Sequence, residues 1–179
     1  MLLEEENIKE YLESVIRTIP DFPKPGIQFK DITTLLNDRK ALKLTTKVLS
    51  EPFKELQCDI VVGLESRGFL FGTNMAEVLN AAFVPVRKPG KLPYESISES
   101  YELEYGTDSV EMHKDAIKKG DKVIIHDDLI ATGGTALAAS KLVQRLGGEI
   151  IGYSFIIELG FLSGREKLKH KKIESILIM

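Results

Sequence analysis

The segment VIIHDDLIATGGT, residues 123–135, combines two neighbouring carboxylates with a turn rich in glycine and threonine. Asp127 and Asp128 follow an apolar run that is typical of a buried parallel strand. Adjacent residues of an extended chain point to opposite sides, so we expect at most one of the two carboxylates to face a given pair of ligand oxygens. Carboxylates in this position suit sugar hydroxyls or a hydrated cation.

The turn after these acids suits a phosphate group. Its glycines let the backbone approach an anion closely, and free N–H groups at the start of a helix favour negative charge. On its own such a turn is also a common helix cap, and an acidic pair after a strand can be a solvated loop. The combination is more specific, because carboxylates at a buried strand reduce stability unless something offsets them. The predicted monophosphate cradle consists of Ala131, Thr132, Gly133, Gly134 and Thr135.

Two further segments carry groups that could bind a second anion. The first is Glu65-Ser66-Arg67, which follows the apolar run 59–63. The second follows the apolar run 82–86 and could equally be a solvated basic turn. Its cations are Arg87, Lys88 and Lys91.

The elements that must position these residues alternate between strand and helix, which predicts an α/β fold with a mainly parallel central sheet. In such sheets ligands bind beyond the carboxyl ends of the strands. Residues 20–26, with three prolines and one glycine, end the first helix. The predicted helices are 2–17, 40–56, 68–79 and 134–146, and the predicted strands are 59–63, 82–86, 122–126, 149–157 and 173–178.

Residues 89–108 lack apolar periodicity and form a long excursion, a feature that often acts as a lid. Within the lid region, about 92–112, we expect residues 101–105 and 109–112 to pair as a small hairpin. We expect one domain over residues 1–179, with an N-terminal helix and hood over about 1–35.

Composition narrows the class of protein. The chain has 179 residues, of which 43% are hydrophobic and 28% charged, so a sizeable core and a soluble globular fold are expected. A single cysteine excludes an internal disulfide, and a net charge of −3 gives no broad basic field for nucleic acid. No apolar run is long enough to span a membrane, and the acidic N-terminal segment is unlike a signal peptide. We therefore expect a cytoplasmic protein.

The motif VIIHDDLIATGGT resembles the phosphoribosyl-pyrophosphate motif of type I phosphoribosyltransferases. The segment FPKPGIQFKDIT is similar to the N-terminal signature of the adenine-specific members of that family. Four more segments match in the same order, so the resemblance covers about residues 8–178. They are GLESRGFLFG, VPVRKPGKLP, YELEYGTD and ELGFLSGREKL.

The resemblance implies transfer of the phosphoribosyl group of 5-phosphoribosyl 1-pyrophosphate to N9 of adenine, with AMP and pyrophosphate as products. It implies that the turn at 131–135 binds the 5′-phosphate and that Asp127 and Asp128 bind the ribose. The pyrophosphate would be bound by Glu65, Ser66, Arg67, Arg87, Lys88 and Lys91.

For adenine, the resemblance implies that Phe29 and Leu159 sandwich the ring while main-chain groups near Gln28 and Lys30 bind its edge. Glu104 would be carried by the lid towards the purine as a proton relay. These assignments make Glu104, Arg67, Asp127 and Asp128 the candidate catalytic residues.

Magnesium is the expected cofactor, held mainly by the substrate pyrophosphate with Asp127 and Asp128 nearby, so no site formed by protein groups alone is expected. Family resemblance also implies a homodimer in which Arg87 reaches into the neighbouring site. His126 stands where an aliphatic residue is expected, and Glu65 where some relatives carry aspartate. We interpret His126 as a packed residue at a strand end.

Two other classes compete with this interpretation. A regulatory protein that only binds phosphoribosyl pyrophosphate would not need Arg67 and Glu104, and it usually adds a DNA-binding element. A serine hydrolase would need the motif G-x-S-x-G, from which Gly63-Leu-Glu-Ser-Arg-Gly68 departs by one position. The sequence contains neither a P-loop nor a G-x-G-x-x-G motif.

Overall fold

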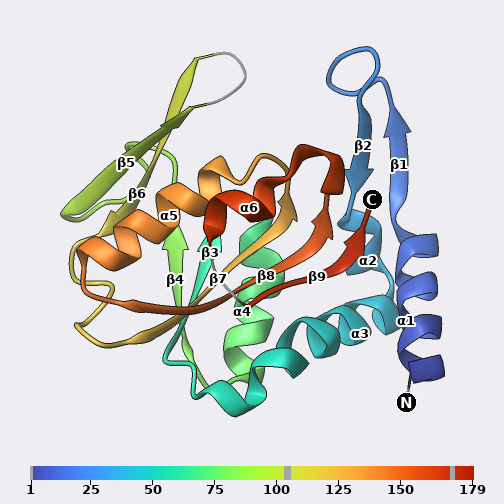
Figure 1. Ribbon diagram of the computed structural model, residues 1–179, viewed down its shortest axis with the longest axis horizontal. Helices are drawn as coiled ribbons and strands as arrows, with labels where there is room; N and C mark the ends of the chain where they lie inside the picture. The colour runs from blue at the N-terminus through green and yellow to red at the C-terminus, as the bar shows by residue number, and fades with distance from the viewer. Residues whose placement is uncertain (1, 103–105, 170–171) are drawn as a thin grey trace. The chain divides into compact units, whose positions relative to one another are not determined.

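The computed structural model (Figure 1) describes residues 2–102, 106–169 and 172–179, with side chains described from residue 6 onwards. The chain forms two compact units, Met1–Val48 and Leu49–Met179. In the described parts, no helix combines the length and apolar character needed to cross a membrane.

The first unit contains helices and a two-stranded antiparallel sheet. The predicted helix over 2–17 is shorter in the structure. Helix α1 (Leu2–Val15) ends at Val15, and β1 (Arg17–Pro20) follows. This strand pairs with β2 (Gln28–Asp31), and an ion pair of 3.6 Å joins Arg17 Nε to Asp31 Oδ2. The proline-rich segment thus forms a hairpin connection that the sequence predicted only as a break. The remaining helices are α2 (Thr33–Asn37) and α3 (Arg39–Ser50), which continues into the second unit.

The second unit confirms the predicted α/β class. Its five-stranded sheet is entirely parallel and has the order β4-β3-β7-β8-β9. The strands are β3 (Ile60–Leu64), β4 (Ala82–Val86), β7 (Lys122–Ile130), β8 (Glu149–Glu158) and β9 (Ile173–Ile178). The other elements are η1 (Glu51–Leu56), α4 (Gly68–Val78), β5 (Ser96–Glu102), β6 (Thr107–His113), α5 (Gly134–Arg145), η2 (Gly160–Leu162) and α6 (Gly164–Leu168).

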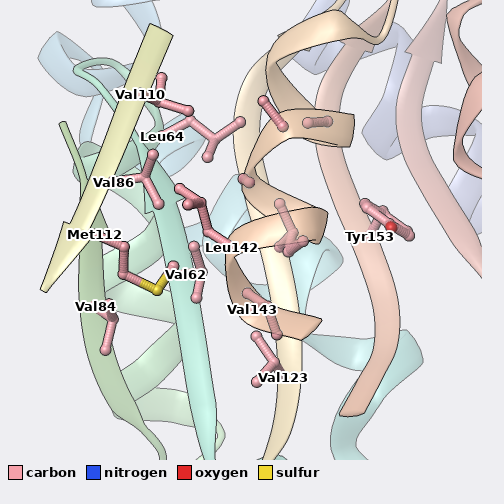
Figure 2. Packing of buried hydrophobic residues seen from close by; sticks show 14 of the residues in the cluster. Val62, Leu64, Val84, Val86, Val110, Met112, Val123, Leu142, Val143 and Tyr153 are labelled. Atoms are coloured by element: carbon pink, nitrogen blue, oxygen red, sulfur yellow. The ribbon is translucent and has the colours of Figure 1, made fainter. Parts of the chain in front are cut away.

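Helices α4 and α5 cover opposite faces of this sheet (Figure 1). Alternate residues of a strand point to opposite faces, so Ile125 joins the cluster packed under α5 while His126 faces Gly72 of α4. Figure 2 shows Leu142 and Val143 of α5 packed against strand residues of this cluster. These buried side chains hold α5 against the sheet, and thereby position the start of α5 near the ends of the strands.

Several predicted boundaries are wrong for identifiable reasons. The strand predicted at 122–126 extends to Ile130, so Asp127 and Asp128 lie inside β7, whose pairing with β8 continues to Ile130. The helix predicted at 40–56 changes from α3 to the 3₁₀ helix η1 after Ser50, because Pro52 has no N–H to donate to an α-helical hydrogen bond.

The excursion after β4 is more regular than expected. Strands β5 and β6 pair over their whole length, with Tyr101 opposite Asp108. A hairpin is therefore confirmed, but it pairs residues 96–102 with residues 107–113 and not 101–105 with 109–112 as predicted. Part of the predicted strand, residues 103–105, lies outside the described residues.

Candidate active site

A cavity of about 500 Å³ lies at the carboxyl ends of the sheet strands and brings together two of the segments singled out in the sequence. One is the loop between β3 and α4, and the other runs from the end of β7 into α5. All members of the predicted phosphate turn and both predicted acids line it. The lining residues are Glu65, Ser66, Arg67, Asp127, Asp128, Leu129, Ile130, Ala131, Thr132, Gly133, Gly134, Thr135, Ala136 and Phe155.

The two segments meet because β3 and β7 are neighbouring parallel strands, with Gly63 opposite His126. Loops that follow such strands leave the sheet at the same edge. An ion pair links them, with Arg67 Nε 2.6 Å from Asp128 Oδ2. The Asp128 side chain is only 6% exposed, so the arginine compensates a carboxylate that is largely removed from water. The peptide bond between Glu65 and Ser66 in this loop is cis.

The two aspartates have different surroundings, although both line the cavity. Asp127 Oδ1 accepts a hydrogen bond of 2.9 Å from the N–H of Asp128. Burial raises the pKa of Asp127 well above its usual range, and the neighbouring Asp128 charge raises it further. Among the described residues, no group of three or more His, Cys, Asp or Glu side chains could hold a metal. The carboxylates of Asp127 and Asp128 suit a cation that takes most of its ligands from phosphates and water.

The phosphate turn is held against the segment that begins α6. Gly133 has a φ of +76°, and a Cβ there would lie 2.4 Å from the carbonyl oxygen of Gly164. In return, a Cβ on Gly164 would lie 2.2 Å from the carbonyl oxygen of Ala131. Such distances require glycine on both sides, so two backbones pack directly. The turn that opens α5 therefore has a defined position, and the first residues of the helix line the cavity.

Glu65 organises the predicted cations of the turn after β4. Its carboxylate accepts hydrogen bonds from Arg87 Nε at 3.1 Å, from the N–H of Lys88 at 2.6 Å and from Lys91 Nζ. Burial raises its pKa, but these hydrogen bonds outweigh burial and lower the pKa to about 2. Arg87, Lys88 and Lys91 do not themselves line the cavity. Glu65 joins the turn that carries these cations to the loop that lines the cavity.

The comparisons with known proteins agree on one family. The model of the phosphoribosyl transferase domain matches residues 31–176. An adenine phosphoribosyltransferase of Alkaliphilus metalliredigens is 57% identical over 166 residues, covering 93% of this chain and 98% of that protein. The crystal structure of adenine phosphoribosyltransferase from Rhodothermus marinus has 55% identity and a TM-score of 0.93, covering 97% of this chain and 99% of that one.

A third relative was crystallised with ligands. It is adenine phosphoribosyltransferase from Saccharomyces cerevisiae, complexed with D-2,5-dideoxy-2,5-imino-altritol 1,6-bisphosphate and adenine. It has 43% identity and a TM-score of 0.90, covering 96% of this chain and 99% of that one. The chain belongs to the adenine phosphoribosyltransferase family. The resemblance and the type I fold expected from the motifs are thereby confirmed.

The residues that the family resemblance links to the purine lie outside the lining of the cavity. Gln28, Phe29 and Lys30 are on β2 in the first unit, where the rings of Phe29 and Phe22 form a T-shaped pair at a centroid distance of 5.1 Å. Leu159 follows β8 in the second unit. The predicted proton relay, Glu104, lies outside the described residues.

Some of the residues that line this cavity were missed in the sequence. Phe155 reaches the cavity from β8, and Leu129, Ile130 and Ala136 line it beside the predicted turn. All four sit in ordinary apolar patterns that do not differ from core positions, so no sequence signal separated them. The central position of Glu65 among the cations was also missed, because it depends on contacts between segments more than twenty residues apart.

His126 is packed, as expected for a residue at that strand position. It is fully buried and does not line the cavity. Its Nδ1 lies 3.0 Å from the carbonyl oxygen of Ser154, and since a carbonyl only accepts, Nδ1 carries the proton. Burial lowers the pKa of His126 to about 4, so the imidazole is neutral near pH 7.

The close approach of the phosphate turn to α6 predicts that Gly133→Ala destabilises the fold more than Gly120→Ala. Both glycines have a positive φ, but a Cβ on Gly120 would meet nothing within 4 Å. We expect about 1–2 kcal/mol of lost unfolding free energy at Gly120 from backbone strain and roughly 1–3 kcal/mol more at Gly133 from the clash. Urea titration of both variants measures the difference, and equal losses would contradict direct backbone packing.

The low pKa of Glu65 predicts a pH-dependent stability contribution. Because this pKa falls from 4.5 to about 2 on folding, the contribution is full above pH 4.5 and disappears as the pH falls towards 2. Glu65→Gln should therefore lower the free energy of unfolding at pH 7 and lose this effect progressively between pH 4.5 and pH 2. Urea titrations of both proteins across this range give the measurement. A difference that stays constant down to the lowest accessible pH would refute the assigned ion pairs.

Proposed function

We propose that this enzyme joins N9 of adenine to C1 of 5-phosphoribosyl 1-pyrophosphate, producing AMP and pyrophosphate in purine salvage. The observation that carries the proposal is that the Glu65–Arg67 loop and the turn at residues 131–135 line the same cavity. One substrate with phosphate groups at both ends of a ribose would need two anion sites at one sheet edge. The yeast relative, crystallised with a bisphosphate and adenine, supports the same ligand classes.

The reaction requires charge to be stabilised as a bond breaks. The C1–O bond to pyrophosphate breaks while the N9–C1 bond forms, so the ribose becomes oxocarbenium-like and the departing pyrophosphate gains negative charge. Arg67 is assigned to that charge, with Ser66 and the loop N–H groups as further donors. Arg67 lies beside Asp128 in the same cavity, which supports a role close to the ribose.

The remaining pyrophosphate contacts are assigned to the turn after β4. Arg87, Lys88 and Lys91 provide the positive charge, and Glu65 holds this turn against the cavity loop. At the other end of the ribose, residues 131–135 bind the 5′-phosphate through backbone N–H groups and the two threonine hydroxyls. With both ends of the donor fixed, its C1 is oriented for attack by the base.

Asp127 and Asp128 are assigned to the ribose hydroxyls and to a magnesium ion bound mainly by the substrate. When bound, magnesium neutralises charge on the pyrophosphate. The protein's own contribution is the pair of carboxylates at one edge of the cavity and the arginine that compensates one of them. No cage of protein ligands is required for this function.

Adenine is assigned to Phe29 and Leu159, which would cover the two faces of the ring, with the main chain near Gln28 and Lys30 at its edge. One residue offers both a donor and an acceptor on its backbone, which suits the edge of adenine. In this proposal residues 1–35 form a hood and residues 92–112 a lid within one functional domain, and Glu104 relays a proton from the purine. The hood and the lid would exclude water, which would otherwise hydrolyse the sugar.

The proposal also includes a cytoplasmic homodimer, as the family resemblance implies. In that arrangement Arg87 serves the neighbouring site. Within one chain Arg87 Nε already bonds to Glu65 Oε2. In such a dimer the turn after β4 would contact Glu65 of its own chain, while Arg87 would also reach the site of the neighbouring chain.

Turnover of adenine, hypoxanthine and guanine should be compared with the ribosyl donor and magnesium present. Adenine should be used at least about 100-fold better, because a site that hydrogen-bonds one edge pattern leaves polar groups unpaired with the others. AMP and pyrophosphate should form in equal amounts, as measured by chromatography and a coupled phosphate assay. Equal use of the three bases would contradict the adenine assignment, and donor binding without turnover would contradict the enzymatic function.

A further inference from the structure

The Tyr101 side chain lies between the two predicted anion sites, although the sequence indicated no functional role for it. In β5 the exposed and partly buried residues alternate, so Ile97, Glu99 and Tyr101 face inwards. The Tyr101 ring packs against the core and lies beside Gly134, where a Cβ would be 3.2 Å from Tyr101 Cδ2. Gly134 is the first residue of α5 and belongs to the phosphate turn.

At its other end Tyr101 contacts the predicted pyrophosphate turn. The Tyr101 hydroxyl accepts a hydrogen bond of 2.9 Å from Lys88 Nζ and donates one of 3.1 Å to Asp108 Oδ2. Lys88 and Asp108 also form a direct ion pair. Burial alone lowers the pKa of Lys88, but its bonds to Asp108 and Tyr101 outweigh burial and raise it. The lysine stays charged in a fixed position.

The hairpin that carries Tyr101 also makes contacts within itself and with α5. Tyr101 and Asp108 are opposite each other across β5 and β6, and the N–H of Ser109 bonds to Asp108 Oδ1 at 2.7 Å. On the same inner face, Glu99 pairs with Lys141 of α5 at 2.8 Å. The hydroxyl is therefore held by a strand that is attached to the helix opening at the phosphate turn.

We propose that Tyr101 is a positioning residue that orients Lys88 for the pyrophosphate group of the ribosyl donor. This inference rests on the proposed function, because it needs Lys88 to bind pyrophosphate. Lys88 has a flexible four-carbon stem and is about one-third exposed, so its ammonium group needs a partner to keep one direction. The backbone N–H of Lys88, bonded to Glu65, fixes the other end of the residue.

The test is Tyr101→Phe, which keeps the ring beside Gly134 and removes only the hydroxyl. It changes no charge, unlike Asp108→Asn, which would also remove an anion that competes for Lys88. Calorimetric titration should show pyrophosphate with magnesium binding about 3- to 10-fold more weakly to the variant. Binding of AMP, which lacks the pyrophosphate group, should change by less than about 2-fold, and the KM for the donor should rise while the KM for adenine does not.

A double-mutant cycle shows whether the effect passes through Lys88. Lys88→Ala should weaken pyrophosphate binding, and adding Tyr101→Phe should cause no further loss. The matched control is Tyr11→Phe, which removes a similar tyrosine–aspartate hydrogen bond, 2.9 Å to Asp38, in the first unit. This control should leave the pyrophosphate affinity unchanged.

Three results would overturn the proposal. The first is an equal loss from Tyr101→Phe with and without Lys88, and the second is weaker AMP binding with unchanged pyrophosphate binding. Both leave the proposed function intact, because Lys88→Ala still weakens pyrophosphate binding. The third is a normal pyrophosphate affinity of Lys88→Ala itself, which removes the pyrophosphate role of Lys88 and the positioning role of Tyr101 together.

Discussion

The ion pair between Arg67 and Asp128 is the contact on which the arrangement of the site depends. It joins the loop after β3 to the end of β7 at a distance of 2.6 Å, and the aspartate is almost completely buried. Removing one partner of such a pair leaves an uncompensated charge, which is far more costly than losing an exposed ion pair. The two loops are therefore held at one edge of the sheet, where together they line one cavity.

The same pairing of opposite charges extends to the other predicted pyrophosphate ligands. Glu65 holds Arg87 and Lys91, while Asp108 holds Lys88. In the proposed function, an incoming polyphosphate would meet cations that are already oriented but whose charge is compensated by carboxylates. Binding would exchange one anionic partner for another, which favours a ligand with several negative oxygens over a single weak anion. The cationic side chains are oriented before the ligand binds, which reduces the entropic cost of ordering them.

The sequence predicted the parts of this site that depend on local chemistry. The acids at 127 and 128 and the turn at 131–135 could be found because strand, carboxylates and glycine-rich turn are contiguous. The parallel sheet followed from the alternation of strands and helices, and the family resemblance followed from motifs along the whole chain. The hairpin of β1 and β2 was missed, because the prolines between the strands signal only the end of a helix.

The contacts that organise the site could not be predicted, because they join distant segments. Nothing near Glu65 indicates that it accepts hydrogen bonds from a turn more than twenty residues later. Likewise, the extension of β7 through the two acids depends on pairing with β8, which a local pattern does not contain. The role of Tyr101 depends on the register of β5 with β6, and a shift by one residue would turn its side chain away from Lys88.

The central claim is that the glycine–threonine turn between β7 and α5 binds the phosphate of a nucleotide while the acids of β7 hold its ribose. A crystal structure of the protein with AMP tests this directly. The account predicts that the phosphate oxygens receive hydrogen bonds from the N–H groups of residues 132–135, with the ribose hydroxyls beside Asp127 and Asp128. A phosphate bound at any other place on the molecule would contradict the account.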